Sequence, residues 1–324
     1  MKVVLFGMSL YNYTKSIKYA LEQLGYEVLM VIDDNNGLNS IYLNFNKQKM
    51  LDFKPDIFIN FCGNYKFNLI DKEFLNNITG RKILMYADAI SYTGTVKQNI
   101  ECYDKIIVFE PQDVNYVKEI YKKECVCVSG SVAEEIYCKK YTNVDILYDL
   151  SFVGAMSTER LIFFNEIAKY VNEKNLKMVI YGHFWHNKHW WQKILAKLKF
   201  KFRYPYLIKY AKNYCLEPEK VALLYKQTKI CLNKHVDRHQ GINYRTFEIM
   251  ANNNFVLCDE RIQANEYGLI NGQNIVFYKN LDDCLNKIEY YINNDVERNT
   301  IAQNGGELVR NFLTTKMAMK KILE

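Results

Sequence analysis

Short, almost uninterrupted apolar runs recur along this chain, and stretches with helical character separate them. In the first half the runs are VVLFG (3–7), YEVLMVID (26–33), DIFINFC (56–62), KILMYAD (82–88), KIIVFE (105–110) and ECVCVSG (124–130). Runs of this length that are apolar throughout are typical of strands buried on both faces, as in parallel sheets covered by helices. The first half therefore predicts a Rossmann-like α/β domain.

The same rhythm returns in the second half, without a sequence repeat. Its runs are LSFVG (150–154), MVIYG (178–182), KICLN (229–233), NFVLCD (254–259) and NIVFY (274–278), with helices expected at 159–173, 242–251 and 308–323. A chain of 324 residues also has the usual length of two domains, at roughly 100 to 200 residues each. We predict two Rossmann-like domains facing a cleft, at 1–146 and 147–307, with a helix at 308–324 that packs back on the first domain.

Composition excludes several classes of protein. No run approaches the roughly 18 apolar residues that span a bilayer, and KVVLFG is too short for the apolar core of a signal peptide. The nine cysteines include no C-x-x-C pair and no disulfide framework. We therefore expect a reduced, cytoplasmic protein. The basic segment described next adds the expectation that it lies at the inner face of the membrane.

The positive charge of the chain is local. From Lys174 to Leu216 there are ten Lys or Arg and no Asp or Glu, and aromatic residues are interleaved with the cations at 186–212. This composition suits peripheral contact with an anionic membrane, or an anionic polymer such as single-stranded nucleic acid. The alternative is a solvated helical insert whose aromatic residues pack on their own domain.

One segment, Ile230–Asp259, reads as strand, polar loop, helix, turn and strand. Its loop and helix start gather cationic and polar side chains: Lys234, His235, Arg238, His239, Asn243, Arg245 and Thr246. Unpaired backbone N–H groups and the helix dipole at such a point favour an anion, which suggests a ligand that carries phosphate. The alternative is an exposed helix face whose charges are only solvated.

Two neighbouring runs end in glycine. Gly154 precedes Arg160, and Gly182 precedes His183, so three strand ends meet where ligands bind in open parallel sheets. Gly7, which ends the first run, is a further candidate for substrate binding.

Several cofactor and metal motifs are missing. The loop after Gly7 has neither a dinucleotide nor a P-loop spacing, so no nicotinamide cofactor is expected. No D-x-D triplet is present to hold a divalent cation. His183, His186 and His189 are three apart but have no acidic or cysteine neighbour, which disfavours a metal. Cations of the protein must then hold a diphosphate, and the candidates are Arg160, Lys234, Arg238 and Arg245.

Asp88 ends the KILMYAD run, where it would lie at the mouth of the first sheet. A carboxylate there can act as the general base that deprotonates an acceptor hydroxyl. The structural alternative is a helix cap.

These motifs together resemble the CgeB/YkvP-like glycosyltransferases of the GT-B fold. The resemblance lies in DLSFVGAMSTER (149–160), MVIYGHFW (178–185), KICLNKH (229–235), GINYRTFEIMANNNFVLCDE (241–260) and the segment 274–305. KPDIFI, MYADAISY and YDKIIVFEPQDVNYVKE in the first half are similar to the family too, though less distinctly.

The resemblance implies a metal-independent transferase without a cofactor, hexosyltransferase-like, acting on a nucleoside diphosphate sugar. It assigns the sugar donor mainly to the C-terminal domain and the glycan, protein or lipid-linked acceptor to the N-terminal one. Glu248 matches the helix glutamate that contacts donor hydroxyls, and Gly154, Arg160, Gly182, His183, Arg245 and Thr246 match the family's loops and helix start.

The chain departs from the wider GT-B pattern at one position. Gln240 stands where related enzymes often have a glutamate, eight residues before the helix glutamate. This leaves open whether the anomeric centre is retained or inverted. It also favours an alternative function, a non-catalytic nucleotide- or glycan-binding protein of a spore or envelope assembly.

Overall fold

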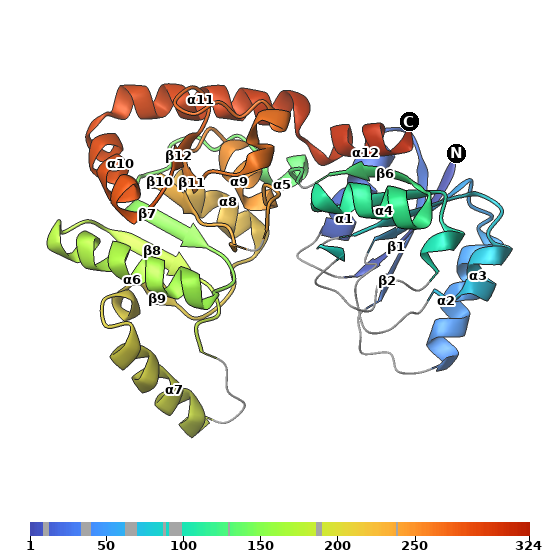
Figure 1. Cartoon of the computed structure of the whole chain (residues 1–324), viewed down its shortest axis with the longest axis horizontal. Coiled ribbons are helices and arrows are strands. Elements are labelled where there is room, and N and C mark those ends of the chain that lie inside the picture. The colour runs from blue at the N-terminus through green and yellow to red at the C-terminus, as the bar shows by residue number, and fades with distance from the viewer. Residues whose placement is uncertain are drawn as a thin grey trace. The chain divides into compact units, whose positions relative to one another are not determined.

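The structure is a computed structural model of the whole chain, and it describes residues 1–8, 13–33, 40–61, 70–86, 89–90, 99–128, 130–185, 190–237 and 239–324. The chain forms two compact units (Figure 1). Unit 1 comprises Met1–Glu134, His239–Gly241 and Leu313–Glu324, and unit 2 comprises Glu135–Arg238 and Ile242–Phe312. The sequence predicted a division after residue 146, whereas the contacts first divide the chain after Glu134, within helix α5 (Glu134–Tyr137).

Unit 1 contains a parallel sheet of six strands in the order β2-β1-β3-β4-β5-β6. The strands are β1 (Lys2–Met8), β2 (Glu27–Asp33), β3 (Ile57–Phe61), β4 (Arg81–Met85), β5 (Lys105–Val108) and β6 (Glu124–Cys127). All six coincide with predicted apolar runs, although β1 extends one residue beyond its run at each end and β4 begins one residue earlier. Alternate residues of β1 face opposite sides, so Val3 and Leu5 join one core and Val4 and Phe6 the other.

Helices cover both faces of this sheet. On one side lie α1 (Tyr13–Gln23) and α12 (Thr315–Leu323), which pack on each other and contribute to the same core. On the other lie α2 (Ser40–Asp52), α3 (Lys72–Asn77), α4 (Gln112–Tyr121) and the short helix η2 (Ile100–Cys102). This is the doubly wound arrangement that the sequence predicted.

Unit 2 repeats the architecture with the strand order β12-β11-β10-β7-β8-β9, again parallel. Its strands are β7 (Tyr148–Val153), β8 (Met178–Tyr181), β9 (Ala211–Lys212), β10 (Thr228–Asn233), β11 (Val256–Asp259) and β12 (Val276–Tyr278). The sequence identified all of these except β9, whose two residues are too few to show an apolar run.

The helices of unit 2 again lie on both faces of the sheet. The core of one face includes α6 (Thr158–Glu173) and α10 (Leu281–Asn293), with residues of α7 (Trp190–Arg203), η3 (Leu207–Lys209) and α11 (Asp295–Phe312). On the other face, α8 (Pro218–Lys226) packs on β7 and β10, and α9 (Tyr244–Met250) packs on β10 and β11. Helix η4 (Ile262–Tyr267) follows β11.

The predicted single helix at 308–323 is wrong, because the chain forms two helices there. Helix α11 ends at Phe312, and Thr314 caps α12 by accepting a hydrogen bond from Met317 N–H at 3.3 Å. The N–H of Thr315 instead donates to the carbonyl of Val132 at 2.8 Å. The side-chain cap and this bond together end α11 and start α12 in unit 1.

In unit 1, Glu110 holds the three residues that come from the later part of the chain. Its buried carboxylate accepts hydrogen bonds from His239 Nδ1 (2.6 Å), Gln240 N–H (2.9 Å) and Gly241 N–H (3.0 Å). Burial alone would raise the pKa of Glu110, but these hydrogen bonds lower it further than burial raises it. The ionised carboxylate therefore stabilises this segment.

Replacing Glu110 with alanine should destabilise the protein, because the buried N–H of Gly241, the N–H of Gln240 and the ring of His239 lose their acceptor. We expect the free energy of unfolding to fall by about 1 to 3 kcal/mol in urea titrations. Since the folded pKa is lowered, the contribution should be present above about pH 4.3 and should disappear as the pH falls below that value. Glu119→Ala, at an exposed position on α4, is the control, and equal losses in both variants would contradict the assignment.

Candidate functional site

The candidate site lies at the carboxyl ends of the strands of unit 2. Because the strands are parallel, the residues that follow β7, β8, β10 and β11 meet at one edge of the sheet. From β7 the order runs outward through β8 and β9 in one direction and through β10, β11 and β12 in the other. Ligands of open α/β sheets bind at such a reversal of strand order, which here lies between β7 and β10.

Two glycines and Arg245 pack closely at this edge. A side chain at Gly154 would place its Cβ 2.5 Å from Arg245 Nη2, so the guanidinium occupies that space. A side chain at Gly182 would place its Cβ 2.4 Å from the carbonyl oxygen of Gly154. Backbone contact therefore requires glycine at 182, whereas a side chain at 154 would displace the guanidinium of Arg245. The structure brings together these three predicted site residues.

Two guanidinium groups share the ring of Phe152. The Cζ of Arg245 lies 5.2 Å from the ring centroid and that of Arg160 lies 5.6 Å from it. Arg160 is 5% exposed, and burial, followed by the charge of Arg245, lowers its pKa to about 9. Within the described part of the chain, neither guanidinium is ion-paired with a carboxylate. Two neighbouring cations without an ion-paired carboxylate make this edge favourable for an anion.

Arg160 also ties two loops together. Its Nε donates to the carbonyl of Lys234 at 2.8 Å and its Nη1 donates to that of Ala155 at 2.7 Å. Its backbone N–H donates to Ser157, the N-cap of α6, which begins after the β7 loop. These contacts give the residue a role in positioning the loops, and its predicted contact with substrate stays a prediction.

The buried side chain of Asn233, at the end of β10, orients the start of α9. Its Nδ2 donates to Thr246 Oγ1 (2.9 Å) and to Asn243 Oδ1 (3.0 Å), while its Oδ1 accepts from Arg245 Nη1 at 3.2 Å. Asn243 is the N-cap of the helix and accepts from Thr246 N–H. Asn243 and Thr246 thus hold Arg245 in place, and their predicted contact with substrate stays a prediction.

Helix α9 differs from the helix predicted at 242–251. It spans seven residues, Tyr244–Met250, and Asn243 already occupies one of its free N–H groups. A shorter, capped helix offers less to an anion than the sequence suggested. The attraction at this edge comes instead from Arg160 and Arg245.

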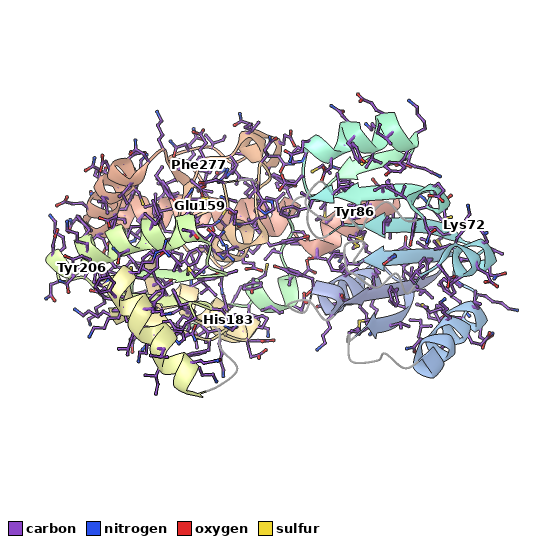
Figure 2. All side chains as sticks on the ribbon, turned by 60° about the horizontal axis from the view of Figure 1, so that its bottom comes forward. Lys72, Tyr86, Glu159, His183, Tyr206 and Phe277 are labelled. Atoms are coloured by element: carbon purple, nitrogen blue, oxygen red, sulfur yellow. The ribbon has the colours of Figure 1, made fainter. Side chains whose placement is uncertain are left out.

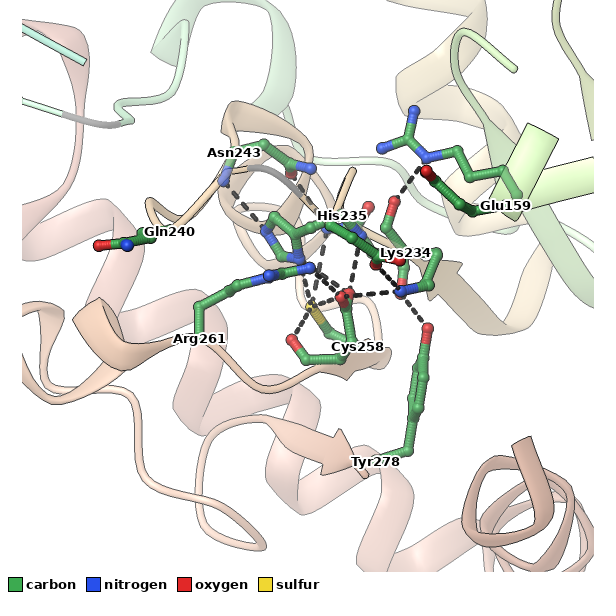
Figure 3. Close-up of polar contacts among 12 residues, drawn as sticks. Glu159, Lys234, His235, Gln240, Asn243, Cys258, Arg261 and Tyr278 are labelled. Atoms are coloured by element: carbon green, nitrogen blue, oxygen red, sulfur yellow. Dashed lines mark hydrogen bonds and ion pairs between the residues drawn. The ribbon is translucent and has the colours of Figure 1, made fainter. Parts of the chain in front are cut away.

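His235, in the loop between β10 and α9 (Figure 3), forms a buried pair with Asp259 at the end of β11. His235 Nδ1 donates to Asp259 Oδ1 at 2.8 Å, and its Nε2 accepts from Asn243 N–H at 3.2 Å, an arrangement that requires the neutral ring. Arg261 Nη2 lies 2.5 Å and Lys234 Nζ 3.6 Å from Asp259 Oδ2. Burial raises the pKa of Asp259, but its hydrogen bonds and these cations hold it far below the usual range.

Burial lowers the pKa of His235 more than Asp259 raises it. The pair is therefore a neutral imidazole against a carboxylate, and it fixes the loop from β10 to α9.

His235, Cys258 and Asp259 place three potential metal-ligand atoms within 4.8 Å of one another. The chemistry of this group does not suit a cation. Burial raises the pKa of the Cys258 thiol well above its usual range, so the sulfur stays protonated. The carboxylate already contacts Arg261 and Lys234, whose charges repel a metal ion. The residues fit a hydrogen-bonded network instead.

The other predicted residues of unit 2 lie in different surroundings. Lys234 pairs with Asp237 at 2.6 Å and with Asp259, so its charge is partly compensated. His183 is exposed in the loop after β8, where its Nε2 lies 3.1 Å from Cys215 Sγ (Figure 2). Glu248 is partly buried on α9. Burial raises the pKa of the Tyr225 hydroxyl well above its usual range, and the nearby charge of Glu248 adds to this effect.

The remaining predicted residues fall outside the described part of the chain or belong to unit 1. Asp88 and Arg238 fall outside the described residues, as do His186 and His189. Gly7 belongs to unit 1, at the end of β1, where a side chain would meet Thr14 Oγ1 at 2.8 Å. Contact with the start of α1 therefore already explains this glycine, and a role in substrate binding stays a prediction.

Sequence reasoning missed Asn233, Asp259 and Arg261. A usable signal existed, since Asn233 and Asp259 are the polar residues that end the KICLN and NFVLCD runs, as Gly154 and Gly182 end theirs.

A surface pocket lined by Tyr148, Lys177 and Lys209 lies at the amino ends of β7 and β8, away from the candidate site at their carboxyl ends.

Residues 160–324, just over half of the chain, match the family described as glycosyl transferase-like. The chain belongs to this family. No curated protein matches the sequence.

Solved structures with the same fold are glycosyltransferases and related proteins of very different sequence. An alpha-glucosyltransferase in complex with UDP and a 13-mer DNA containing an HMU base has a TM-score of 0.74 at 11% identity, over 99% of this chain and 98% of that one. Sucrose-phosphate synthase from Thermosynechococcus elongatus has 0.69 at 10% identity, over 100% and 98%.

HepE from Anabaena in complex with UDP-glucose has 0.65 at 11% identity, again over 100% and 98%. The predicted GT-B fold is confirmed by these matches. In the described residues no helix has the length and apolarity needed to cross a bilayer.

Alanine at the two loop glycines should have different costs. At Gly182 the new Cβ meets backbone, which cannot move aside, so we expect a loss of about 1 to 3 kcal/mol in the free energy of unfolding. At Gly154 it meets the end of a flexible side chain, and we expect a loss below about 1 kcal/mol with Arg245 displaced. Urea titration of both variants tests the order, and a larger loss at Gly154 would contradict it.

Asp259→Asn should remove the charge on which His235 and Arg261 depend. We expect the free energy of unfolding at pH 7 to fall by about 3 kcal/mol. The folded pKa of Asp259 is lowered, so its contribution is complete above the unfolded value of about 3.9 and shrinks as the pH falls below it.

Thermal unfolding at several pH values measures this difference between the variant and the natural protein. Asp237→Asn, at an exposed carboxylate that also pairs with Lys234, is the control and should change stability by less than about 1 kcal/mol. A pH-independent difference for Asp259→Asn would refute the charged pair.

Proposed function

We propose that this protein transfers a glycosyl group from a nucleoside diphosphate sugar to a hydroxyl of a glycan, protein or envelope acceptor, without a metal ion. The observation that carries the proposal is the pair of guanidiniums at Phe152, which lack a carboxylate partner in the described residues. A diphosphate supplies the negative charge that this pair lacks. The family and the UDP and UDP-glucose bound in the similar structures support the same donor class.

The chemistry assigns a role to each group. The acceptor oxygen attacks the anomeric carbon while the bond from that carbon to the diphosphate oxygen breaks, and negative charge grows on the leaving nucleoside diphosphate. Arg245, held by Asn233 at 3.2 Å, stabilises that charge, and Arg160 adds to the field. Glu248, one turn later on α9, is assigned to donor hydroxyls. Asp88 is assigned to the base that takes the acceptor proton.

The finer assignments complete the proposal. We place the activity in the cytoplasm, in the CgeB/YkvP-like group and among the hexosyltransferases. The resemblance of 149–160, 178–185 and 241–260 to that group supports these assignments.

One observation favours a second function. Gln240 has no carboxylate where related enzymes often have one, which is consistent with a protein that binds a nucleotide or glycan without transfer. Incubation with a panel of nucleoside diphosphate sugars, beginning with UDP-glucose, separates the two. Release of free nucleoside diphosphate supports transfer. A raised melting temperature with nucleoside diphosphates, without release across donors and acceptors, supports binding alone.

Arg245→Ala should reduce turnover by roughly 100- to 1000-fold, the usual effect of removing one preorganised donor to a developing charge. We expect the melting temperature to change little, because the guanidinium is only partly buried. Nucleoside diphosphate release measures turnover.

Arg203→Ala, at an exposed arginine of the same unit, is the control and should keep normal turnover. Unchanged turnover and donor binding in Arg245→Ala would refute the role of this residue. Arg245→Lys keeps the charge but not the planar fork and should recover only part of the activity.

A further inference from the structure

Helix α7 exposes an unusual amount of apolar side chain. Ile194, Leu195, Leu198 and Phe202 are 51%, 50%, 57% and 91% exposed. In Figure 1 the helix stands apart from the sheet of unit 2, and Figure 2 shows side chains projecting from it. Large apolar residues that are exposed together on one element mark an interaction surface.

The side chains of α7 form rows four residues apart along the helix. Phe200 is buried in the core of unit 2 beside Phe184 and Trp185, and the row that contains it, with the partly buried Gln192 and Ala196, faces the protein. The row Ile194, Leu198 and Phe202 lies two positions further on, which at 100° per residue is the opposite side of the helix. This apolar row therefore faces away from unit 2.

Cations flank the apolar row on both sides. The row Lys193, Lys197 and Lys201 lies between it and the docked row on one side, and Lys199 and Arg203 lie on the other. All five are exposed, and no Asp or Glu occurs between Lys174 and Leu216. Long cationic side chains beside an apolar stripe can extend toward charged groups above it while the apolar side chains insert below.

We propose that this face of α7 docks on an anionic lipid surface. The apolar row inserts at the boundary of headgroups and acyl chains, and the five cations lie among the anionic headgroups. The proposal does not rest on the glycosyltransferase reaction. Helix α7 lies in an insert between β8 and β9, and the proposed docking face is the side of that helix that points away from unit 2.

The same surface suits other partners less well. A second copy of the chain would bring two sets of five cations together without a neutralising acid from α7. Single-stranded nucleic acid binds through aromatic faces on which bases stack, whereas three of the four exposed apolar residues among the α7 side chains that the structure describes are aliphatic. Lipid matches both the charge and the aliphatic row.

The test is sedimentation of the full chain with vesicles. We expect binding to vesicles of phosphatidylcholine with phosphatidylglycerol, and at least about tenfold weaker binding to phosphatidylcholine alone. The double variant Leu198→Ser with Phe202→Ser should lower the affinity for anionic vesicles at least tenfold, as should Lys197→Gln with Lys201→Gln, at about fivefold per lysine. All four positions are exposed, so the melting temperature should stay unchanged.

Val296→Ser is the matched control. Val296 is 84% exposed on α11 between Asp295 and Glu297, so it is equally apolar but lies in acidic surroundings. It should bind as the natural protein does, and Lys197→Arg with Lys201→Arg should do the same. No binding to anionic vesicles, equal binding to both vesicle types, or equal loss in the control overturns the proposal. So do binding to oligonucleotides but not vesicles, and a dimer that Phe202→Ser dissociates.

Discussion

The buried charge of Asp259 is the interaction on which the candidate site depends. A carboxylate in the interior is costly unless hydrogen bonds and opposite charges surround it. Here His235 and Arg261 supply them. The other nitrogen of His235 accepts the N–H of Asn243, the residue that caps α9 and thereby sets the position of Arg245. A chain of short-range contacts thus connects the end of β11 to the guanidinium at the edge of the sheet.

The strand order gives this chain of contacts its place. Neighbouring loops diverge between β7 and β10, because the chain leaves β7 toward one edge of the sheet and returns at β10 to build toward the other. Gly154 lines one side of the divergence and the loop of His235 the other. Arg245 fills the volume that a side chain at Gly154 would need, and the backbone of Gly154 fills the volume that one at Gly182 would need. Packing of the Arg160 and Arg245 side chains concentrates positive charge there, and the dipole of a long helix is not required.

Much of the fold was readable from the sequence because burial on both faces leaves an unbroken apolar run, and eleven of the twelve strands in the described residues carry one. Strand β9 could not be found, since two residues show no pattern. Gly154, Gly182 and Arg245 were identified because they stand at strand ends and a helix start. Asp259 could not be identified because its partner His235 is distant in sequence. Arg261 could not be identified because its contact with Asp259 depends on the turn between the two residues. For the same reason, the local sequence did not predict that Glu110 would bind His239–Gly241, or that α11 would end before Thr314.

The location of α12 has a consequence for the order in which the chain can fold. Met319 and Ile322 complete the core that Val3, Leu5 and Ile17 begin, yet all of unit 2 is synthesised between them. During translation one apolar face of the first sheet stays incompletely covered until α12 is synthesised. The helices that cover the second sheet are all part of unit 2 itself. A nascent chain halted before residue 315 should therefore expose that face to chaperones or to its neighbours, although every strand of both sheets has already been made.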